Sequence, residues 1–434
     1  MAFLVATEGF ERFSYYGMQA LLVLYMTGHL LKPGVIDHIV GFSTFRPAVE
    51  SVFGRLTNQA LATVIVGLYG GGVYAAPILG SLIGDRIGRR GTVTVGLAIM
   101  VCGHFLMAFE TMFLVALACL LVGSGLLKGN VAAQVGALYA PTDSRLDQAY
   151  SIFYMAINIG AFFSPLACGT LGEVYGWHYG FTVAGIVMLA GLGVYLSGWR
   201  YLPAGSAKAR AVGPAPGRAD LPRLAAMGVL ILVAALYWTS ALQIGNTYNL
   251  WVRDRLDRSA FGLTAPVTWF QSVDSIGVVI VAPAVIGFWR WQAARHREPG
   301  DLSKVAWGCL IFAATLLWLG LGELLAGHAK VPLLWALAFH LFTALGYLYF
   351  APVIVALLSR AAPANATGAV ISIYYLAICA GSIASGWLSR FYGVVGDAEF
   401  WAIHAALTAS GGIVLLLFRR PLTKALAISS PMAA

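Results

Sequence analysis

Apolar stretches of about 20 residues recur along the whole chain, separated by short segments rich in Gly, Pro and Arg. A helix needs about 20 consecutive apolar residues to cross a bilayer, so each stretch predicts a membrane span. The predicted spans cover residues 3–28, 58–84, 91–110, 112–139, 149–172, 178–200, 222–250, 265–291, 303–326, 332–359, 365–392 and 398–418. The pattern therefore predicts an all-α membrane protein with twelve transmembrane helices.

The first apolar stretch is unusual because it contains three charged residues, Glu8, Glu11 and Arg12. One ionised side chain at the centre of a bilayer helix costs at least about 2.5 to 3.5 kcal/mol. At about 100° per residue, these charges share a helical stripe with Tyr15 and Tyr16, while most apolar neighbours lie outside the stripe. We expect the stripe to face protein or water and to mark a transport pathway.

Composition and charge agree with a membrane protein. The chain is 59% hydrophobic and 10% charged, with a mean hydropathy of +0.80, whereas soluble domains have about 25% charged residues. Its net charge of +9 does not form a nucleic-acid-binding face, because the basic residues recur between spans. The positive-inside rule makes these loops cytoplasmic, so both termini are predicted to lie in the cytoplasm and the protein in the inner membrane. A cleavable signal is not expected, because the first stretch continues as a full span.

Catalytic and metal-binding patterns are not found in the sequence. The five cysteines stand alone in apolar segments, without CxxC or Cys/His spacing, so neither a disulfide framework nor a metal site is expected. The spans contain no Ser/His/Asp cluster. We therefore expect a protein that is not an enzyme and has no cofactor.

The strongest break in the chain is a segment of Pro, Gly, Ala and basic residues between spans 6 and 7. It predicts an N-terminal six-helix bundle at 1–201, a cytoplasmic linker at 202–221, a C-terminal six-helix bundle at 222–420 and a cytoplasmic tail at 421–434. Two such bundles place a substrate site between them, near the middle of the membrane.

Residues 80–90, GSLIGDRIGRR, lie between spans 2 and 3. The glycines allow close helix approach and a tight turn, and Asp85 with the arginines can bind helix ends. This segment resembles the cytoplasmic loop motif of the major facilitator superfamily. The resemblance implies the two-bundle fold of that superfamily.

Three further motifs narrow this resemblance to one family. Residues 8–17 read EGFERFSYYG, residues 123–130 read GSGLLKGN, and residues 153–160 read FYMAINIG. In this order they resemble the signatures of the proton-dependent oligopeptide transporters. Tyr74 and Gln243 also stand where that family places pocket residues. The resemblance implies symport of protons with di- or tripeptides into the cytoplasm.

The side chains in these motifs suit that chemistry. The fork of donors on Arg12 matches a carboxylate, whereas Lys128 is a compact charge on a flexible stem. Glu8 and Glu11 repel each other in a low dielectric, which favours a proton on one of them. Alternatively, the carboxylates neutralise Arg12 and Lys128 in a fixed network that only holds helices together.

From the motifs and these chemical arguments we predict two overlapping sets of site residues. The predicted proton-coupling residues are Glu8, Glu11, Lys128 and Asp274. The predicted substrate-binding residues are Arg12, Tyr15, Tyr16, Tyr74, Lys128, Asn158, Gln243, Asn246, Asp274 and Tyr347.

The C-terminal half departs from the family pattern at two acidic positions. The family usually has an acid beside the span 7 glutamine and a glutamate in span 10, where this chain has Leu242 and Tyr347. In span 8, FQSVDS at 270–275 resembles the family's QxxNP with Asp274 in place of the asparagine. Either Asp274 or His340 in span 10 could replace the missing acids.

These observations predict a proton-coupled symporter that imports di- or tripeptides, or peptide-like carboxylates, by alternating access. One alternative is a carrier of another amino-acid-derived or anionic metabolite, including an exporter. Another is a ligand sensor that does not transport. The expected partners are a small-molecule substrate and the lipid bilayer, the proton is the coupling ion, and the expected state is a monomer without nucleic acid.

Overall fold

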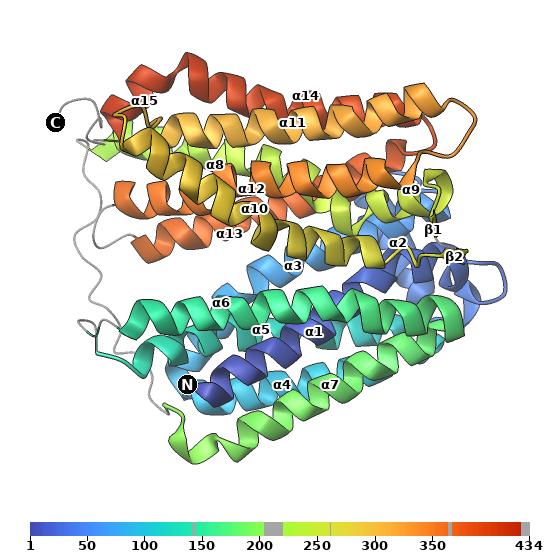
Figure 1. Ribbon diagram of the computed structural model, residues 1–434. Helices are drawn as coiled ribbons and strands as arrows, with labels where there is room; N and C mark the ends of the chain where they lie inside the picture. The colour runs from blue at the N-terminus through green and yellow to red at the C-terminus, as the bar shows by residue number, and fades with distance from the viewer. Residues whose placement is uncertain (141–142, 144, 204–219, 261, 363–366, 427–434) are drawn as a thin grey trace. The chain divides into compact units, whose positions relative to one another are not determined.

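The structure is a computed structural model in which helices dominate (Figure 1). It describes residues 1–140, 143, 145–203, 220–260, 262–362 and 367–426. Within these residues, ten helices are long and apolar enough to cross a membrane. The prediction of an all-helical membrane protein is therefore confirmed at this level.

The chain forms two compact units. The first contains Met1–Arg210, Ile244–Arg253 and Ala260–Ser272, and the second contains Ala211–Gln243, Asp254–Ser259 and Val273–Ala434. The predicted linker at 202–221 falls largely outside the described residues.

Seven long or medium helices build most of the first unit. They are α1 (Ala2–Tyr25), α2 (Phe42–Phe53), α3 (Asn58–Ile87), α4 (Arg89–Leu106), α5 (Phe113–Ala137), α6 (Arg145–Ser164) and α7 (Trp177–Ser197). After α6 the helix continues through two π-helical segments, Pro165–Gly169 and Leu171–Tyr175. The missing N–H of Pro165 explains why regular α-helical hydrogen bonding stops there.

Close glycine contacts hold α3 against α5. A Cβ added to Gly80 would lie 1.9 Å from the carbonyl oxygen of Gly125, and one added to Gly129 would lie 2.2 Å from Ser81 Oγ. Asn130 of α5 stabilises this contact between α3 and α5 by donating a hydrogen bond of 2.9 Å to the Gly80 carbonyl oxygen. The glycines of the GSGLLKGN motif therefore allow a close approach that also fixes the position of Lys128 on α5.

The loop motif between spans 2 and 3 forms the turn from α3 to α4. Gly88 has a φ of 96°, a value that favours glycine. Asp85 pairs with Arg89 one turn later, with 2.8 Å between Oδ1 and Nη2. Arg90 donates to the carbonyl oxygen of Leu202. One arginine of the loop thus forms an ion pair within the turn, and another binds a distant backbone carbonyl of the same unit.

Seven helices also carry the second half of the chain. They are α8 (Leu221–Ala241), α10 (Trp269–Ala293), α11 (Asp301–Ala326), α12 (Leu333–Ala361), α13 (Thr367–Leu388), α14 (Asp397–Leu417) and α15 (Arg419–Ala425). Tyr237 of α8 stacks on Phe350 of α12 with ring centroids 3.7 Å apart. Trp318 of α11 and Trp335 of α12 also stack, and each donates its indole N–H to the other's carbonyl oxygen. The second unit therefore has an aromatic core.

Several local features differ from the predicted spans. The predicted outer loop after span 1 contains the helix α2, and the predicted span 222–250 is broken between α8 and α9 (Thr247–Arg255) by a 3-10 turn at Leu242–Gly245. Two short strands, β1 (Ser259–Ala260) and β2 (Leu263–Thr264), pair in the following loop. Hydrophobic length alone missed these changes because it does not mark a break inside an apolar run.

Candidate functional site

The charges of α1 form one buried group in the first unit. Arg12 Nε lies 2.9 Å from Glu8 Oε1 and 2.6 Å from Glu11 Oε2. The side chains of Glu8, Glu11 and Arg12 are 5%, 0% and 9% exposed. The structure therefore brings together the three residues that the helical stripe predicted, and we call these residues with Lys128 the charge cluster.

Both carboxylates contact the same nitrogen atom of Arg12. Glu8 accepts a hydrogen bond from Nε, and Glu11 makes a close ionic contact with that atom. Nη1 and Nη2 donate no hydrogen bond to any residue that the structure describes. Arg12 is thus neutralised from its Nε side, while the two terminal donors that match a carboxylate remain available.

Lys128 of α5 faces aromatic rings instead of a carboxylate. Its Nζ lies 4.5 Å from the ring centroid of Tyr15 and 5.7 Å from that of Tyr74. The described part of the chain places no acidic oxygen within 4.0 Å of Nζ. Cation–π contacts of this kind hold an ammonium group without neutralising its charge. The predicted residues Tyr15, Tyr74 and Lys128 are therefore neighbours.

Residues around the charge cluster complete its walls. Tyr16 is half-buried, and its ring lies 5.2 Å from that of Tyr15. Tyr69 of α3 was not predicted; its hydroxyl is buried within electrostatic range of Glu11 and has no hydrogen-bond partner among the described residues. The sequence signal for it was weak, since Tyr69 stands in an otherwise apolar, glycine-rich segment. A buried hydroxyl without a hydrogen-bond partner is a candidate substrate or water contact.

Helix α6 packs on α1 through Gly160. A Cβ at this position would lie 2.7 Å from the Gly9 carbonyl oxygen and 3.1 Å from Arg12 Cβ. Asn158 lies on the exposed side of α6 and donates to the Tyr154 carbonyl oxygen at 2.9 Å. The FYMAINIG motif thus has a packing residue that supports Arg12 and an exposed amide that remains a predicted substrate contact.

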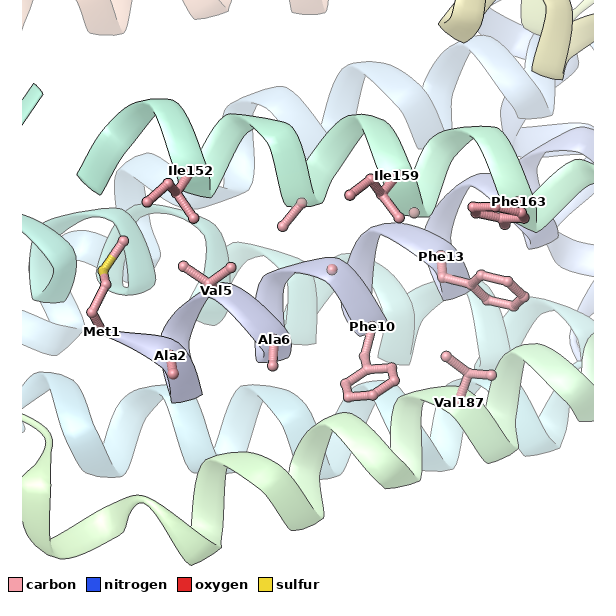
Figure 2. A pocket seen from close by; sticks show the side chains of 13 residues that line it. Met1, Ala2, Val5, Ala6, Phe10, Phe13, Ile152, Ile159, Phe163 and Val187 are labelled. Carbon is pink, nitrogen blue, oxygen red and sulfur yellow. The ribbon is translucent and has the colours of Figure 1, made fainter. Parts of the chain in front are cut away.

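The opposite side of α1 is apolar. A groove of about 660 Å³ lies between α1, α6 and α7. Figure 2 shows side chains that line it, including Phe10, Phe13, Ile159 and Val187. Charged residues do not line it. Helix α1 therefore separates an apolar face suited to lipid from a polar face that carries the charge cluster.

Asn246 belongs to the first unit and is buried. Its amide donates to the carbonyl oxygen of Thr63 on α3 at 3.1 Å, while its Oδ1 has no partner among the described residues. Nearby, Asn249 donates to the Ala20 carbonyl oxygen at 3.4 Å. These amides connect the start of α9 to α1 and α3, and a substrate role for Asn246 stays a prediction.

Gln243 lies in the second unit, where its amide is fully engaged. Nε2 donates to the Ser385 carbonyl oxygen at 3.0 Å and contacts His404 Nε2 at 3.2 Å, and Oε1 accepts from Ser389 Oγ at 2.9 Å. The side chain is 1% exposed. Gln243, in the 3-10 turn after α8, thus contacts α13, the 3-10 turn that follows α13, and α14. Its contact with substrate stays a prediction.

The second unit also pairs two residues that the sequence singled out separately. His340 Nδ1 on α12 lies 3.3 Å from Asp274 Oδ1 on α10. The Asp274 side chain is 34% exposed and that of His340 is 0% exposed. Tyr347, two turns along α12, is 38% exposed. The acid of α10 therefore has a histidine partner on α12.

Within the described residues, no group of three or more His, Cys, Asp and Glu side chains has an arrangement that could hold a metal ion. The charge cluster supplies two carboxylates, a guanidinium and an ammonium group. This set of groups can bind a zwitterionic or anionic small molecule and exchange protons with it.

Comparison with known proteins identifies relatives over nearly the whole chain. The sequence model described as the POT family, PTR2, matches residues 90–211 and 217–399. A protein named peptide transporter YePEPT from Yersinia enterocolitica is 27% identical, over 88% of this chain and 86% of its own. A di-/tripeptide transporter from Lactococcus lactis subsp. cremoris is 26% identical, over 97% of this chain and 95% of its own.

Solved structures give the same result. A variant of the peptide transporter POT, crystallised with alafosfalin, matches with a TM-score of 0.84 and 26% identity, over 98% of this chain and 94% of that chain. The same transporter with sulfate also matches with a TM-score of 0.84, at 25% identity and the same coverage. These relatives are transporters, and the resemblance seen in the sequence motifs is confirmed.

Proposed function

Because this chain belongs to the POT family, we propose that it is a proton-coupled symporter that carries di- or tripeptides, or peptide-like carboxylates, into the cytoplasm. It is an integral, multi-pass membrane protein. Its relatives named as peptide transporters support the substrate class.

One observation carries the proposal most directly: the arrangement around Arg12. Glu8 and Glu11 hold its Nε, and the terminal nitrogens are left for another partner. A substrate carboxylate would take a bidentate pair of hydrogen bonds there, the geometry for which a guanidinium is best suited. Tyr15, whose ring lies 5.6 Å from the guanidinium carbon, would form one side of this subsite.

Proton coupling is proposed to use the carboxylates of the charge cluster. A proton on Glu8 or Glu11 removes one of the two negative charges on Arg12, which strengthens the attraction between Arg12 and an incoming carboxylate. Lys128 then responds to the change in local charge, because its ammonium is held by rings and not by an acid. Alternating access follows when substrate and proton together favour one arrangement of the helices.

We further propose that α1 and α4 also cross the membrane, which gives twelve spans in total. Both termini would then lie in the cytoplasm, and the protein would lie in the inner membrane. Helix α1 differs from the ten apolar helices by its three charges, which are buried inside the first unit. Helix α4 begins with Arg89 and Arg90, next to the cytoplasmic turn. Burial of the charges removes the main cost of placing α1 in lipid.

The test is counterflow in proteoliposomes with dialanine, followed by gradient-driven uptake with a pH dye inside the vesicles. The proposal expects exchange of labelled dialanine, and internal acidification when dialanine enters. N-acetylated dialanine provides the comparison for a free amino terminus. Exchange without acidification would reject proton coupling. Uptake of the blocked acid but not of dialanine would favour a carrier of another anionic metabolite, and binding without exchange would favour a sensor.

A further inference from the structure

Asp274 and His340 meet where α10 and α12 pack together in the second unit. Besides the 3.3 Å contact between Oδ1 and Nδ1, a Cβ added to Gly277 would lie 3.4 Å from the His340 carbonyl oxygen and 3.5 Å from the Ala344 side chain. Gly277 is one turn after Asp274 on the inner side of α10. The contact between the two side chains is therefore supported by close packing of the two backbones.

The two partners differ in how much of each side chain is exposed. His340 is completely buried, whereas the Asp274 side chain is 34% exposed. A proton can therefore reach the pair through the carboxylate and be held against the buried imidazole. An imidazole in contact with a carboxylate is a natural proton acceptor near neutral pH.

Tyr237 is a titratable group of α8 that faces Asp274. Tyr237 of α8 lies within electrostatic range of Asp274 and also of Tyr347 on α12, Tyr374 on α13 and Cys309 on α11. Phenols and thiols titrate well above neutral pH in the absence of an activating charge. Tyr237 and the three groups near it are thus phenols and a thiol, and they carry no charge near pH 7.

From these observations we propose that Asp274 and His340 form a second proton-binding site of this transporter, built on different helices from the charge cluster. The inference rests on the proposed function. An incoming proton converts the pair from carboxylate and neutral imidazole, with net charge −1, to carboxylate and imidazolium, with net charge zero. No other bond changes. Release of the same proton restores the starting charge.

The consequence for transport is that protonation changes the charge on an exposed part of the second unit. When the pair is deprotonated, Asp274 offers an anionic oxygen to a cationic group such as a substrate amino terminus. When it is protonated, the imidazolium neutralises that attraction. The pair would thus supply a titratable acid in a half of the chain that has Leu242 and Tyr347 at the positions where the family has acids.

A first experiment tests proton binding without any substrate. Protein with isotope-labelled histidines is titrated by NMR, and the His340 signal is the one among the eight histidines that His340→Gln removes, or His340→Asn if the first variant does not fold. We expect this signal to shift with pH in the unaltered protein, because the proton that the pair takes up resides on the imidazole. In Asp274→Asn the midpoint of this shift should move by at least about one pH unit, or the shift should vanish. A signal that does not titrate, or that titrates identically in both proteins, would overturn the proposal.

A second experiment measures coupling in proteoliposomes with dialanine. Loss of one coupled proton lowers the accumulation ratio about tenfold for each pH unit of gradient, since each pH unit is equivalent to a factor of ten per proton. We expect this loss in Asp274→Asn and in His340→Gln, with counterflow retained. His104→Leu is the control, because His104 is also buried but has no hydrogen-bond partner among the described residues. It should leave the accumulation ratio unchanged.

The two experiments separate the two claims. If the unaltered protein does not exchange dialanine, the proposed function fails for this substrate, while the histidine titration still decides whether the pair binds a proton. If it exchanges dialanine and both variants accumulate it as strongly as the unaltered protein, the pair has no part in coupling and the inference fails alone.

Discussion

Arg12 has three donor positions, and the structure assigns only one of them to the protein's own acids. Because two of its nitrogens make no hydrogen bond to these acids, Arg12 is suited to a further role besides neutralising Glu8 and Glu11. A fixed ion-pair network would be better satisfied if the carboxylates met the guanidinium fork in a bidentate way, because that arrangement has the strongest geometry. The observed contacts on Nε therefore favour the substrate interpretation over the purely structural one.

We predict that Arg12→Lys raises the KM for dialanine about tenfold, which corresponds to about 1.4 kcal/mol. Lysine keeps the positive charge near Glu8 and Glu11 but loses the planar fork. Uptake kinetics provide the measurement. The control is Arg145→Lys, which alters an exposed arginine whose hydrogen bonds hold the pKa of Asp143 at about 2. An unchanged KM in Arg12→Lys would contradict carboxylate binding by the fork.

Lys128 leads to a different prediction, about coupling and not affinity. Lys128→Ala should abolish accumulation driven by a proton gradient and spare part of the counterflow, because the ammonium responds to protonation of the nearby acids while rings hold it in place. Comparing the two assays on one preparation is the measurement. Normal concentrative uptake by this variant would remove Lys128 from the coupling mechanism.

Among the helices, the contact between α3 and α5 determines where Lys128 stands. We predict that Gly80→Ala destabilises the protein by about 1 to 3 kcal/mol, as overpacking of a tight contact usually does. The added Cβ would lie 1.9 Å from a backbone oxygen of α5, which cannot rotate away. Thermal unfolding in detergent, followed by tryptophan fluorescence, measures the effect. Gly228→Ala is the matched control, because nothing lies within 4 Å of its added Cβ.

The start of α10 depends on one carboxylate of the first unit. Glu173 accepts hydrogen bonds from the backbone N–H groups of Val267 and Thr268, at 2.8 and 2.9 Å, and from the Thr268 hydroxyl at 2.7 Å. Trp269 adds a hydrogen bond of 2.8 Å to Thr170. Glu173 therefore caps the helix N-terminus, where a negative charge is favourable.

We predict that Glu173→Gln increases hydrogen–deuterium exchange of the amides at Val267 and Thr268 about tenfold. The amide side chain has one acceptor oxygen where the carboxylate has two, and it has lost the charge that strengthens these bonds, a loss of about 1.4 kcal/mol. Exchange measured by mass spectrometry on peptides covering this loop provides the test. Unchanged protection would show that other contacts hold the start of α10.

At the scale of the whole molecule, the number and orientation of spans can be tested directly. A single cysteine at Arg295, between α10 and α11, should react with an impermeant maleimide only from the cytoplasmic side. A single cysteine at Asp37, before α2, should react only from the outside. Both positions are exposed. Each cysteine is introduced into a background in which the five native cysteines are replaced. Labelling of both positions from one side would contradict the twelve-span arrangement.

The sequence predicted those features that follow from spacing within one helix. The contact between Glu8 and Arg12 needs only the i, i+4 geometry of α1, and the glycine motif on α5 already indicated close packing. The family motifs were equally local, and the comparisons confirm the family that they indicated.

Features that depend on distances between helices could not be read from the sequence. Asp274 and His340 are 66 residues apart, and Gln243 finds its partners on α13 and α14 more than 140 residues later. Their roles were therefore predicted one residue at a time, without their neighbours. The break between α8 and α9 was missed because an apolar run can continue through a 3-10 turn.

The sharing of Arg12 Nε by Glu8 and Glu11 makes this ion pair redundant. Either acid can take up a proton without leaving Arg12 as an isolated buried cation, since the other acid also lies in ionic contact with the same nitrogen. A network with a spare partner can thus change its protonation in single steps and avoid the large penalty of an uncompensated charge. Loss of one glutamate should accordingly be tolerated in folding, whereas loss of both should not.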